Sequence, residues 1–259
     1  MDVTSPIGDR LRDWRQRRRL SQLDLSLDAE ISTRHLSFIE TGRSKPSRDM
    51  VLRLAAELDV PLRERNALLL AAGYAPVFAD RPLDDAALAT ARQAIETLLD
   101  AHDPFPALAI DRHWNLVAAN RGANRLMQGV ATHLLEPPVN VLRLSLHPDG
   151  AASRIANLGE WKAHLLHRLR KQFEASADPQ LLELMEELRG YPAPPAPKPD
   201  PGTIAVPLVV NGASGAMAFL STTLLFGSPL DVTLSELAIE IFLPADAETV
   251  ERLRAVASR

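Results

Sequence analysis

Between residues 21 and 47 the chain repeats the residue types that start and stop short helices, and their spacing limits what it can form. Ser21 and Ser32 each precede a segment of helical apolar spacing, where a hydroxyl can cap the first free amides. Gly42 ends the second segment, because glycine enters the left-handed conformation at a helix C-terminus without penalty, and Pro46-Ser47 starts another. The sequence therefore predicts several helices of about two turns, separated by tight turns.

Apolar spacing on either side extends this pattern to five helices. Glu30 lies in the turn between the second and third helices, where it has to accept a left-handed backbone at some cost. The core between these two helices should consist of Leu25, Ala29, Leu36 and Ile39. The five helices are expected over residues 7–20, 22–29 and 33–41, from 46 onward, and from 61 to about 72.

Two short helices joined by a tight turn make a helix-turn-helix, and this stretch resembles the Cro/repressor-type (xenobiotic response element) family. The resemblance covers about Ile7 to Tyr74 and combines caps, core positions and helix terminators. It implies a transcription regulator that binds double-stranded DNA with its third helix in the major groove, and we expect a homodimer. The residues that carry the resemblance are Ser21-Gln22, Leu25, Ala29, Ile31-Ser32, Leu36-Ser37, Ile39-Glu40, Gly42-Arg43 and Pro46-Ser47.

The same resemblance implies which side chains meet DNA. The fork of Arg34 can satisfy O6 and N7 of guanine together, whereas Phe38 can only contact a thymine methyl or pack. Gln22 would hold a phosphate through its side chain and the free amides of the second helix. The residues expected at base edges are Ser32, Thr33, Arg34, Ser37 and Phe38. Those expected to hold the DNA backbone on the far side are Thr41, Arg43 and Lys45.

Charge is divided unevenly along the chain. The formal net charge is -4 at pH 7, yet residues 1–75 carry 13 Lys+Arg against 11 Asp+Glu, and the rest carries 16 against 22. A local basic patch is enough to attract phosphate, because salt limits the reach of the attraction to about 8 Å. We expect that patch in a block that no acid follows before Asp24, formed by Arg15, Arg17, Arg18 and Arg19.

After residue 75 the pattern becomes mixed α/β. Helices are expected over 84–101, 120–127, 155–175, 179–189 and 246–257, and a proline-rich loop over 191–202. Strands are expected over 107–110, 114–119, 203–210, 216–226 and 234–243, which makes an α+β domain with an antiparallel sheet. In the last strand, the side with Leu237, Ile239, Ile241 and Leu243 should be buried. The side with Glu236, Ala238, Glu240 and Phe242 should be partly wet.

The order of hairpin, helices and three further strands resembles a PAS-like fold. Residues 140–144, 147–150 and 226–233 resemble the MmyB-like ligand-binding domain of bacterial regulators, over about Asp103 to Arg254. That resemblance implies a pocket for a small, largely apolar ligand, with a fatty acid as the best guess. The expected lining is Trp114, Phe219, Leu220, Phe226 and Phe242, with Arg154 as the carboxylate partner. Alternatively, these aromatic residues are only core and Arg154 pairs with a neighbouring acid.

The sequence argues against several classes of protein. It has no cysteine, which excludes disulfides and Cys-based zinc sites. It has a polar N-terminus and no run of about 18 apolar residues, so we expect no signal peptide, no membrane span and a cytoplasmic location. Motifs for phosphate cradles, serine hydrolases and zinc proteases are lacking, so we expect no enzyme. Glu160, His164 and His167 share a helical face, but we expect no metal there, and no cofactor beyond a bound fatty acid.

Together these patterns predict a multidomain regulator that responds to a ligand. It would consist of an all-α helix-turn-helix domain over 1–75, a linker and connecting helix over 76–102, and a PAS-like ligand-binding or dimerisation domain over 103–259. One alternative is a constitutive DNA-binding regulator whose C-terminal domain only dimerises or binds a protein partner, which a dry, fully packed core would favour. Another is an interaction module whose partner docks on Leu23 and Leu27, exposed one turn apart on the second helix.

Overall fold

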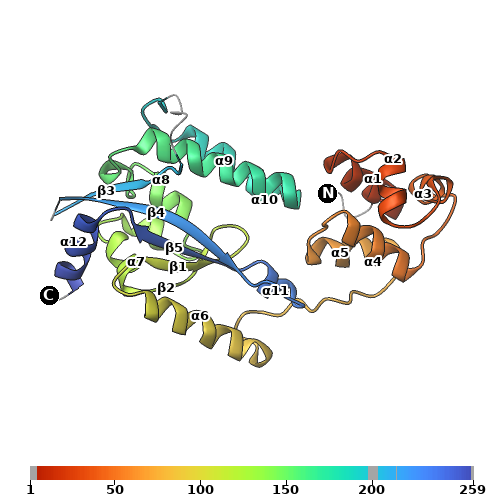
Figure 1. Cartoon of the computed structure of the whole chain (residues 1–259), viewed down its shortest axis with the longest axis horizontal. Helices are drawn as coiled ribbons and strands as arrows, with labels where there is room; N and C mark the ends of the chain where they lie inside the picture. The colour runs from red at the N-terminus through yellow and green to blue at the C-terminus, as the bar shows by residue number, and fades with distance from the viewer. Residues whose placement is uncertain (1–4, 198–203, 214, 258–259) are drawn as a thin grey trace. The chain divides into compact units, whose positions relative to one another are not determined.

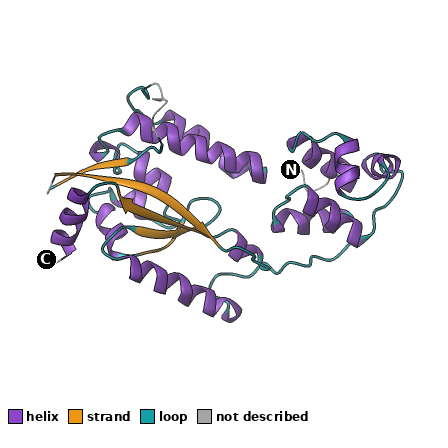
Figure 2. Cartoon of the chain, in the orientation of Figure 1, coloured by secondary structure: helices purple, strands orange, loops and turns teal. Residues whose placement is uncertain are grey.

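The computed structural model describes residues 5–197, 204–213 and 215–257. Contacts divide the chain into two compact units (Figure 1). The first unit holds the chain up to residue 81 together with residues 172–179 and 229–235, and the second holds the remainder. Figure 2 shows that strands occur in the second unit, whereas the first is helical. Within the described residues, no helix is both long enough and apolar enough to span a bilayer.

The five helices predicted for the N-terminal part are present, with slightly shorter bounds. The caps act as expected: Ser21 and Asp24 form a reciprocal capping box, and the Ser32 hydroxyl accepts from the His35 amide. Ser47 caps the fourth helix in the same way. The helices are α1 (Ile7–Arg17), α2 (Gln22–Asp28), α3 (Thr33–Glu40), α4 (Arg48–Glu57) and α5 (Leu62–Ala71), and α11 (Val232–Ser235) joins this unit from far along the chain.

The core of the first unit lies where the apolar spacing put it. The four predicted residues, Leu25, Ala29, Leu36 and Ile39, have no exposed surface. They pack with Leu11, Trp14 and Leu54 in one cluster. The backbone φ is 52° at Glu30 and 71° at Gly42, so both predicted left-handed positions are confirmed. Packing of this cluster holds α2 and α3 across a short turn, which is the helix-turn-helix geometry.

The second unit is built on a five-stranded antiparallel sheet. Its strands run in the order β2-β1-β5-β4-β3, so the first hairpin lies beside the last strand. This is the α+β architecture that the sequence predicts, although the third strand begins only at Leu208, after Pro207. Thr203, the expected first residue of that strand, lies outside the described residues. The strands are β1 (Ala107–Ile110), β2 (Leu116–Ala119), β3 (Leu208–Gly212), β4 (Gly215–Leu225) and β5 (Ala238–Pro244).

Helices cover the sheet from both sides, with α9 and α6 on opposite sides in Figure 1. The main helices are α6 (Ala89–His102), α7 (Arg121–Leu126), α8 (Val141–Leu146), α9 (Leu158–Ser176), α10 (Pro179–Gly190) and α12 (Ala247–Ala257). Three short 3-10 turns, η1 (Ala86–Leu88), η2 (Thr132–Leu135) and η3 (Ala152–Arg154), accompany them. Helix α8 was not predicted from the sequence, and the last strand begins later than predicted, because Val232–Ser235 is helical.

The predicted division of the last strand into a buried and a partly wet side holds for most of its residues but is wrong at Glu240 and Leu243. Glu240, expected on the wet side, is 3% exposed, while Leu243, expected to be buried, is 43% exposed. Glu240 and Phe242 both line a cavity in the second unit, together with residues of α9, so their side of β5 is covered as well. Alternation along a strand separates its two sides, but it does not say which neighbours cover them.

Candidate DNA-binding helix and ligand cavity

The outer side of α3 carries the residues expected at base edges. Arg34 is exposed, Ser37 and Phe38 are half-buried, and Leu36 and Ile39 point into the core. Two of the side chains expected to contact bases have hydrogen-bond partners within the protein. The Ser32 hydroxyl caps the helix, and the Thr33 hydroxyl lies 2.9 Å from that of Ser26. His35, which the sequence analysis does not name, is also exposed on α3. A continuous polar and aromatic surface therefore follows this helix.

Two arginine side chains approach the ring of Phe38. The guanidinium carbon of Arg34 is 5.3 Å from the ring centroid, and that of Arg43 is 5.9 Å from it. Both distances are within the range of a cation–π contact. The amides of Arg43 and Ser44 both donate to the Phe38 carbonyl, which ties the loop after α3 back to this helix. The Phe38 ring therefore contacts both Arg34, which the sequence predicts at base edges, and Arg43, which it predicts at the DNA backbone.

The remaining predicted backbone contacts follow the end of α3. Thr41 is exposed, but its hydroxyl donates to the Ser37 carbonyl at 2.7 Å. Lys45 is exposed, and its ammonium group lies 5.3 Å from the centroid of the Tyr74 ring. The Tyr74 hydroxyl in turn donates to the carbonyl of Pro46 at 3.0 Å. Arg43 and Lys45 are therefore the two accessible cations of this loop among the predicted contacts.

The expectation of a basic patch at residues 15–19 is wrong for Arg15. Its side chain is buried and donates two hydrogen bonds to Glu40, and Arg18 donates to the carbonyls of Leu58 and Asp59. The Gln22 side chain, expected on a phosphate, donates to Glu40 at 2.7 Å. The buried carboxylate of Glu40, at the end of α3, therefore binds the Arg15 guanidinium and the Gln22 amide, which the sequence pattern assigns to DNA. The sequence shows that Arg15 and Glu40 are charged, but not that they lie within hydrogen-bond distance of each other.

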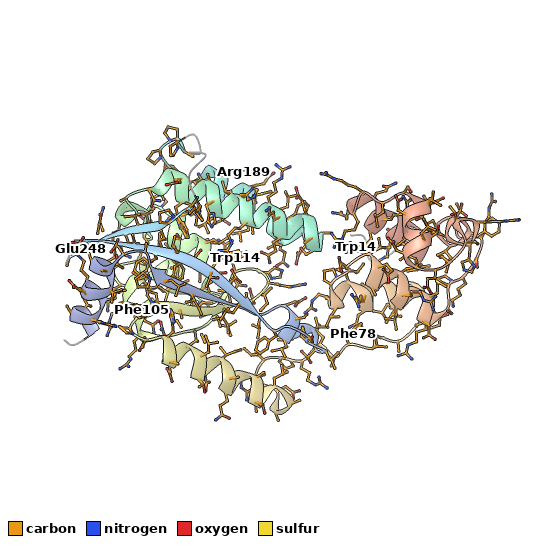
Figure 3. The ribbon with its side chains drawn as sticks, viewed as in Figure 1. Trp14, Phe78, Phe105, Trp114, Arg189 and Glu248 are labelled. Atoms are coloured by element: carbon orange, nitrogen blue, oxygen red, sulfur yellow. The ribbon has the colours of Figure 1, made fainter. Side chains whose placement is uncertain are left out.

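A cavity of about 100 Å³ lies in the second unit, between the sheet and helices α7, α8 and α9. Almost all of its lining is apolar, with Trp114, Trp161 and Phe242 as the aromatic residues. Figure 3 labels Trp114, which is 5% exposed and has a φ of 67°. A bulky residue rarely adopts this left-handed conformation, and such strain is characteristic of functional sites. The amides of His113 and Asn115 hold the turn by donating to the Asp111 carboxylate at 2.8 Å.

The structure brings two of the six predicted ligand residues to the cavity wall, Trp114 and Phe242. Phe219 is fully buried on the same side of the sheet, edge-on to Phe242 at 6.4 Å. Leu220 pairs with Leu243 in the register, and both belong to the opposite side of the sheet. Phe226 follows the end of β4, and Arg154 donates to the Leu126 carbonyl at 2.7 Å. These four residues are not part of the described lining.

Most residues of the cavity wall were not predicted from the sequence. Two of its missed members carry charge, Arg168 on α9 and Glu240 on β5. Next to them, His164 stacks on Trp161 at 5.3 Å, and burial together with the charge of Arg168 lowers the pKa of His164. The other missed lining residues are Pro106, Leu108, Ala123, Leu126, Met127, Val130, Val141, Leu142, Leu144, Ser145, Ala151, Ile155, Trp161, Leu165, Leu208 and Val210. Apolar residues at helical or alternate spacing, such as Leu142 and Leu144, were the available signal, but core residues give the same signal.

Among the described residues, one group of side chains has the composition of a metal site. Atoms of His133, His147 and Asp149 lie within 4.8 Å of one another. However, the Asp149 amide donates to Nδ1 of His147 at 3.0 Å, and the carboxylate is 61% exposed. This bond is an ordinary way of closing the turn between His147 and Gly150. The group expected to be ordinary, Glu160 with His164 and His167, is not brought together as a ligand set in the described part of the chain.

Comparison with known proteins gives two family matches. The model described as "MmyB-like transcription regulator ligand binding domain" matches residues 91–256, and the model described as "Helix-turn-helix" matches residues 11–65. No curated protein matches the chain. A solved structure titled "Structure of an RNA-binding Light-Oxygen-Voltage Receptor" is similar at 15% identity and a TM-score of 0.28. The match extends over 99% of this chain but spans less than two thirds, 65%, of that one.

Proposed function

The chain belongs to the family of MmyB-like transcription regulator ligand-binding domains, with a helix-turn-helix ahead of that domain, and we propose that a small apolar ligand in its cavity modulates DNA binding. DNA binding by a transcription regulator follows from the two matched families. The observation that supports the finer proposal is a cavity whose wall is almost wholly apolar, in the domain that carries the ligand-binding family match.

The DNA-binding step follows from the surface of α3. Its eight residues form a rod short enough to enter the major groove, with Arg34 exposed for a bidentate contact to guanine. Arg43 and Lys45 would hold phosphates on the far side, which positions the helix without selecting sequence. As a homodimer, the protein would bind two half-sites whose spacing is set by the distance between its two α3 helices. We place this activity in the cytoplasm.

The regulatory step needs a ligand that prefers one arrangement of the protein. A ligand shifts an equilibrium only by its difference in affinity for the two states. The ligand would thereby change the operator affinity. A regulator whose C-terminal domain only dimerises would be expected to have a fully packed core, so the cavity supports the ligand-responsive alternative over this one.

Selection from random duplex DNA by the purified full-length chain tests the proposal. We expect one enriched sequence, and then a change in affinity for that sequence when the cavity is filled, measured at constant salt. No enriched sequence would contradict DNA recognition. Equal affinities with and without bound ligand would contradict modulation and leave the constitutive alternative. A single stoichiometric protein partner captured through Leu23 and Leu27, which are 56% and 67% exposed, would instead favour the interaction module.

A further inference from the structure

The polar end of the cavity is a closed ion pair. Arg168 of α9 donates to both carboxylate oxygens of Glu240, at 3.0 and 2.6 Å, and Glu240 is 3% exposed. The Thr223 hydroxyl donates to Glu240 at 2.7 Å and accepts from Arg168 at 2.9 Å. The register places Thr223 directly opposite Glu240, so three groups from two strands and a helix form one hydrogen-bonded set.

Aromatic packing holds this pair in place. The guanidinium carbon of Arg168 lies 4.8 Å from the centroid of the Trp114 ring, the residue with the strained backbone. A two-bond contact between guanidinium and carboxylate is strong and has a defined geometry. Removing one partner of a buried pair leaves an uncompensated charge, which is far more costly than keeping both. The guanidinium of Arg168 is therefore already bound to Glu240, and the ion pair adds no net charge to the cavity wall.

An incoming carboxylate would meet an unfavourable site. It would have to displace Glu240 from Arg168 or lose its own hydration beside a second buried carboxylate, and either event opposes binding. Among the described lining residues, Arg168 and Glu240 are the charged ones. Arg154, the cation expected to receive a carboxylate, holds the Leu126 backbone instead. The cavity thus lacks an available cation for an anionic headgroup.

The volume of the cavity limits the size of the ligand. A cavity of about 150 Å³ lined by apolar side chains holds benzene, and this one measures about 100 Å³. Its aromatic wall, with Trp114, Trp161 and Phe242, suits a flat ring. A long acyl chain would require lining side chains to move.

Building on the proposed function, we infer that the cavity selects a compact, uncharged ring compound with one hydroxyl or carbonyl group, and rejects a carboxylate such as a fatty acid. The apolar ring fills the space between the sheet and α9. The single polar group hydrogen-bonds at the edge of the Arg168–Glu240 pair without breaking it. Glu240 is thereby a specificity-determining residue, because its charge is what neutralises Arg168.

Calorimetry on the full-length chain with two ring-matched probes of one ring each, benzyl alcohol and benzoate, tests this inference near neutral pH. We expect the alcohol to bind roughly tenfold or more tightly than the carboxylate, because only the carboxylate meets the buried like charge. The Val141→Phe variant, which fills part of the cavity wall, should abolish alcohol binding and so locate the site. Circular dichroism would establish that this variant is folded.

The Glu240→Gln variant makes the test specific. It keeps the shape of the side chain and leaves Arg168 with its charge, so benzoate should gain roughly tenfold in affinity while the alcohol changes less. Glu248→Gln, at the exposed Glu248 of α12, is the matched control and should change neither ligand.

The outcomes separate the two claims. Benzoate that binds the unmodified chain as tightly as the alcohol would overturn the inference and leave the ligand cavity intact. If neither probe bound, and phenol and other uncharged single-ring compounds did not bind either, both the inference and the proposed ligand site would fall. The comparison on the unmodified chain stands even if Glu240→Gln does not fold.

Discussion

Arg15 of α1 and Glu40, the last residue of α3, form a buried ion pair in which Nε and Nη2 of the arginine lie 2.6 and 2.9 Å from the two carboxylate oxygens. Gln22 of α2 donates to the same carboxylate, and Arg12 lies 3.5 Å from it. One carboxylate therefore links three helices at the end of α3. Because α3 is the helix expected in the major groove, this contact sets the orientation of the DNA-binding surface.

Replacement of Glu40 by alanine should destabilise the helical unit by about 3–5 kcal/mol, because Arg15 is left buried without its partner. Hydrogen exchange of the α1 and α3 amides in the full-length chain measures this loss locally. The Glu57→Ala variant, which removes an exposed acid of α4, is the control and should change protection by less than about 0.5 kcal/mol. Unchanged protection in Glu40→Ala would contradict the structural role of the pair.

The same pair should make the stability of the unit depend on acid. Burial raises the pKa of Glu40, but hydrogen bonds from Arg15 and Gln22 and the arginine charges outweigh it, so the pKa lies below the usual 4.5. A lowered pKa contributes stability that is complete above the unfolded value and is lost as the pH falls through the folded one. Between about pH 6 and about pH 3, the unmodified chain should therefore lose more stability than Glu40→Gln. Parallel pH profiles would exclude this contribution.

Arg34→Ala should lose discrimination between operator and mismatched DNA by about 1–3 kcal/mol, because its fork is the bidentate base contact. Arg43→Ala should instead weaken binding to all sequences alike and reduce the slope of affinity against salt by about one. Fluorescence anisotropy with matched duplexes at several salt concentrations measures both effects. An Arg34→Ala protein that keeps the full operator preference would show that α3 does not meet the bases as proposed.

Phe38→Leu should weaken operator binding by about 1–2 kcal/mol, since two cation–π contacts, to Arg34 and Arg43, are lost together. Phe38→Tyr keeps a ring at the same place and should retain most of the affinity. Titrations at constant salt compare the two variants. If leucine proved as good as tyrosine, the ring would act only through its volume.

Gly8→Ala should destabilise the packing of α1 on α3, although alanine favours a helix by about 1 kcal/mol. A β-carbon at Gly8 would lie 2.5 Å from the Ile39 carbonyl oxygen and 2.7 Å from that of Glu40, so the two backbones would have to separate. The expected cost is about 1–3 kcal/mol, seen as a lower melting temperature of the full-length chain. Gly190→Ala, where nothing lies within 4 Å, should be neutral and serves as the control.

Much of the local structure was predictable from the sequence, because it depends on neighbours along the chain. The caps at Ser21, Ser32 and Ser47 and the left-handed positions at Glu30 and Gly42 lie where the residue types place them. The helical core follows from spacing of three and four residues. The antiparallel α+β architecture of the second part likewise follows from its strand and helix patterns.

The sites depend on contacts between residues far apart in the chain, and here the sequence alone was insufficient. Glu40 could be recognised as part of a family pattern, yet only folding places it against Arg15 and removes that arginine from the basic patch. Glu240 alternates with apolar residues as a solvent-facing strand residue would, but Arg168, 72 positions away, covers it. A periodic pattern reports how side chains alternate between sides of an element. Which partner covers each side, and therefore which charges remain available to DNA or a ligand, is decided by tertiary packing.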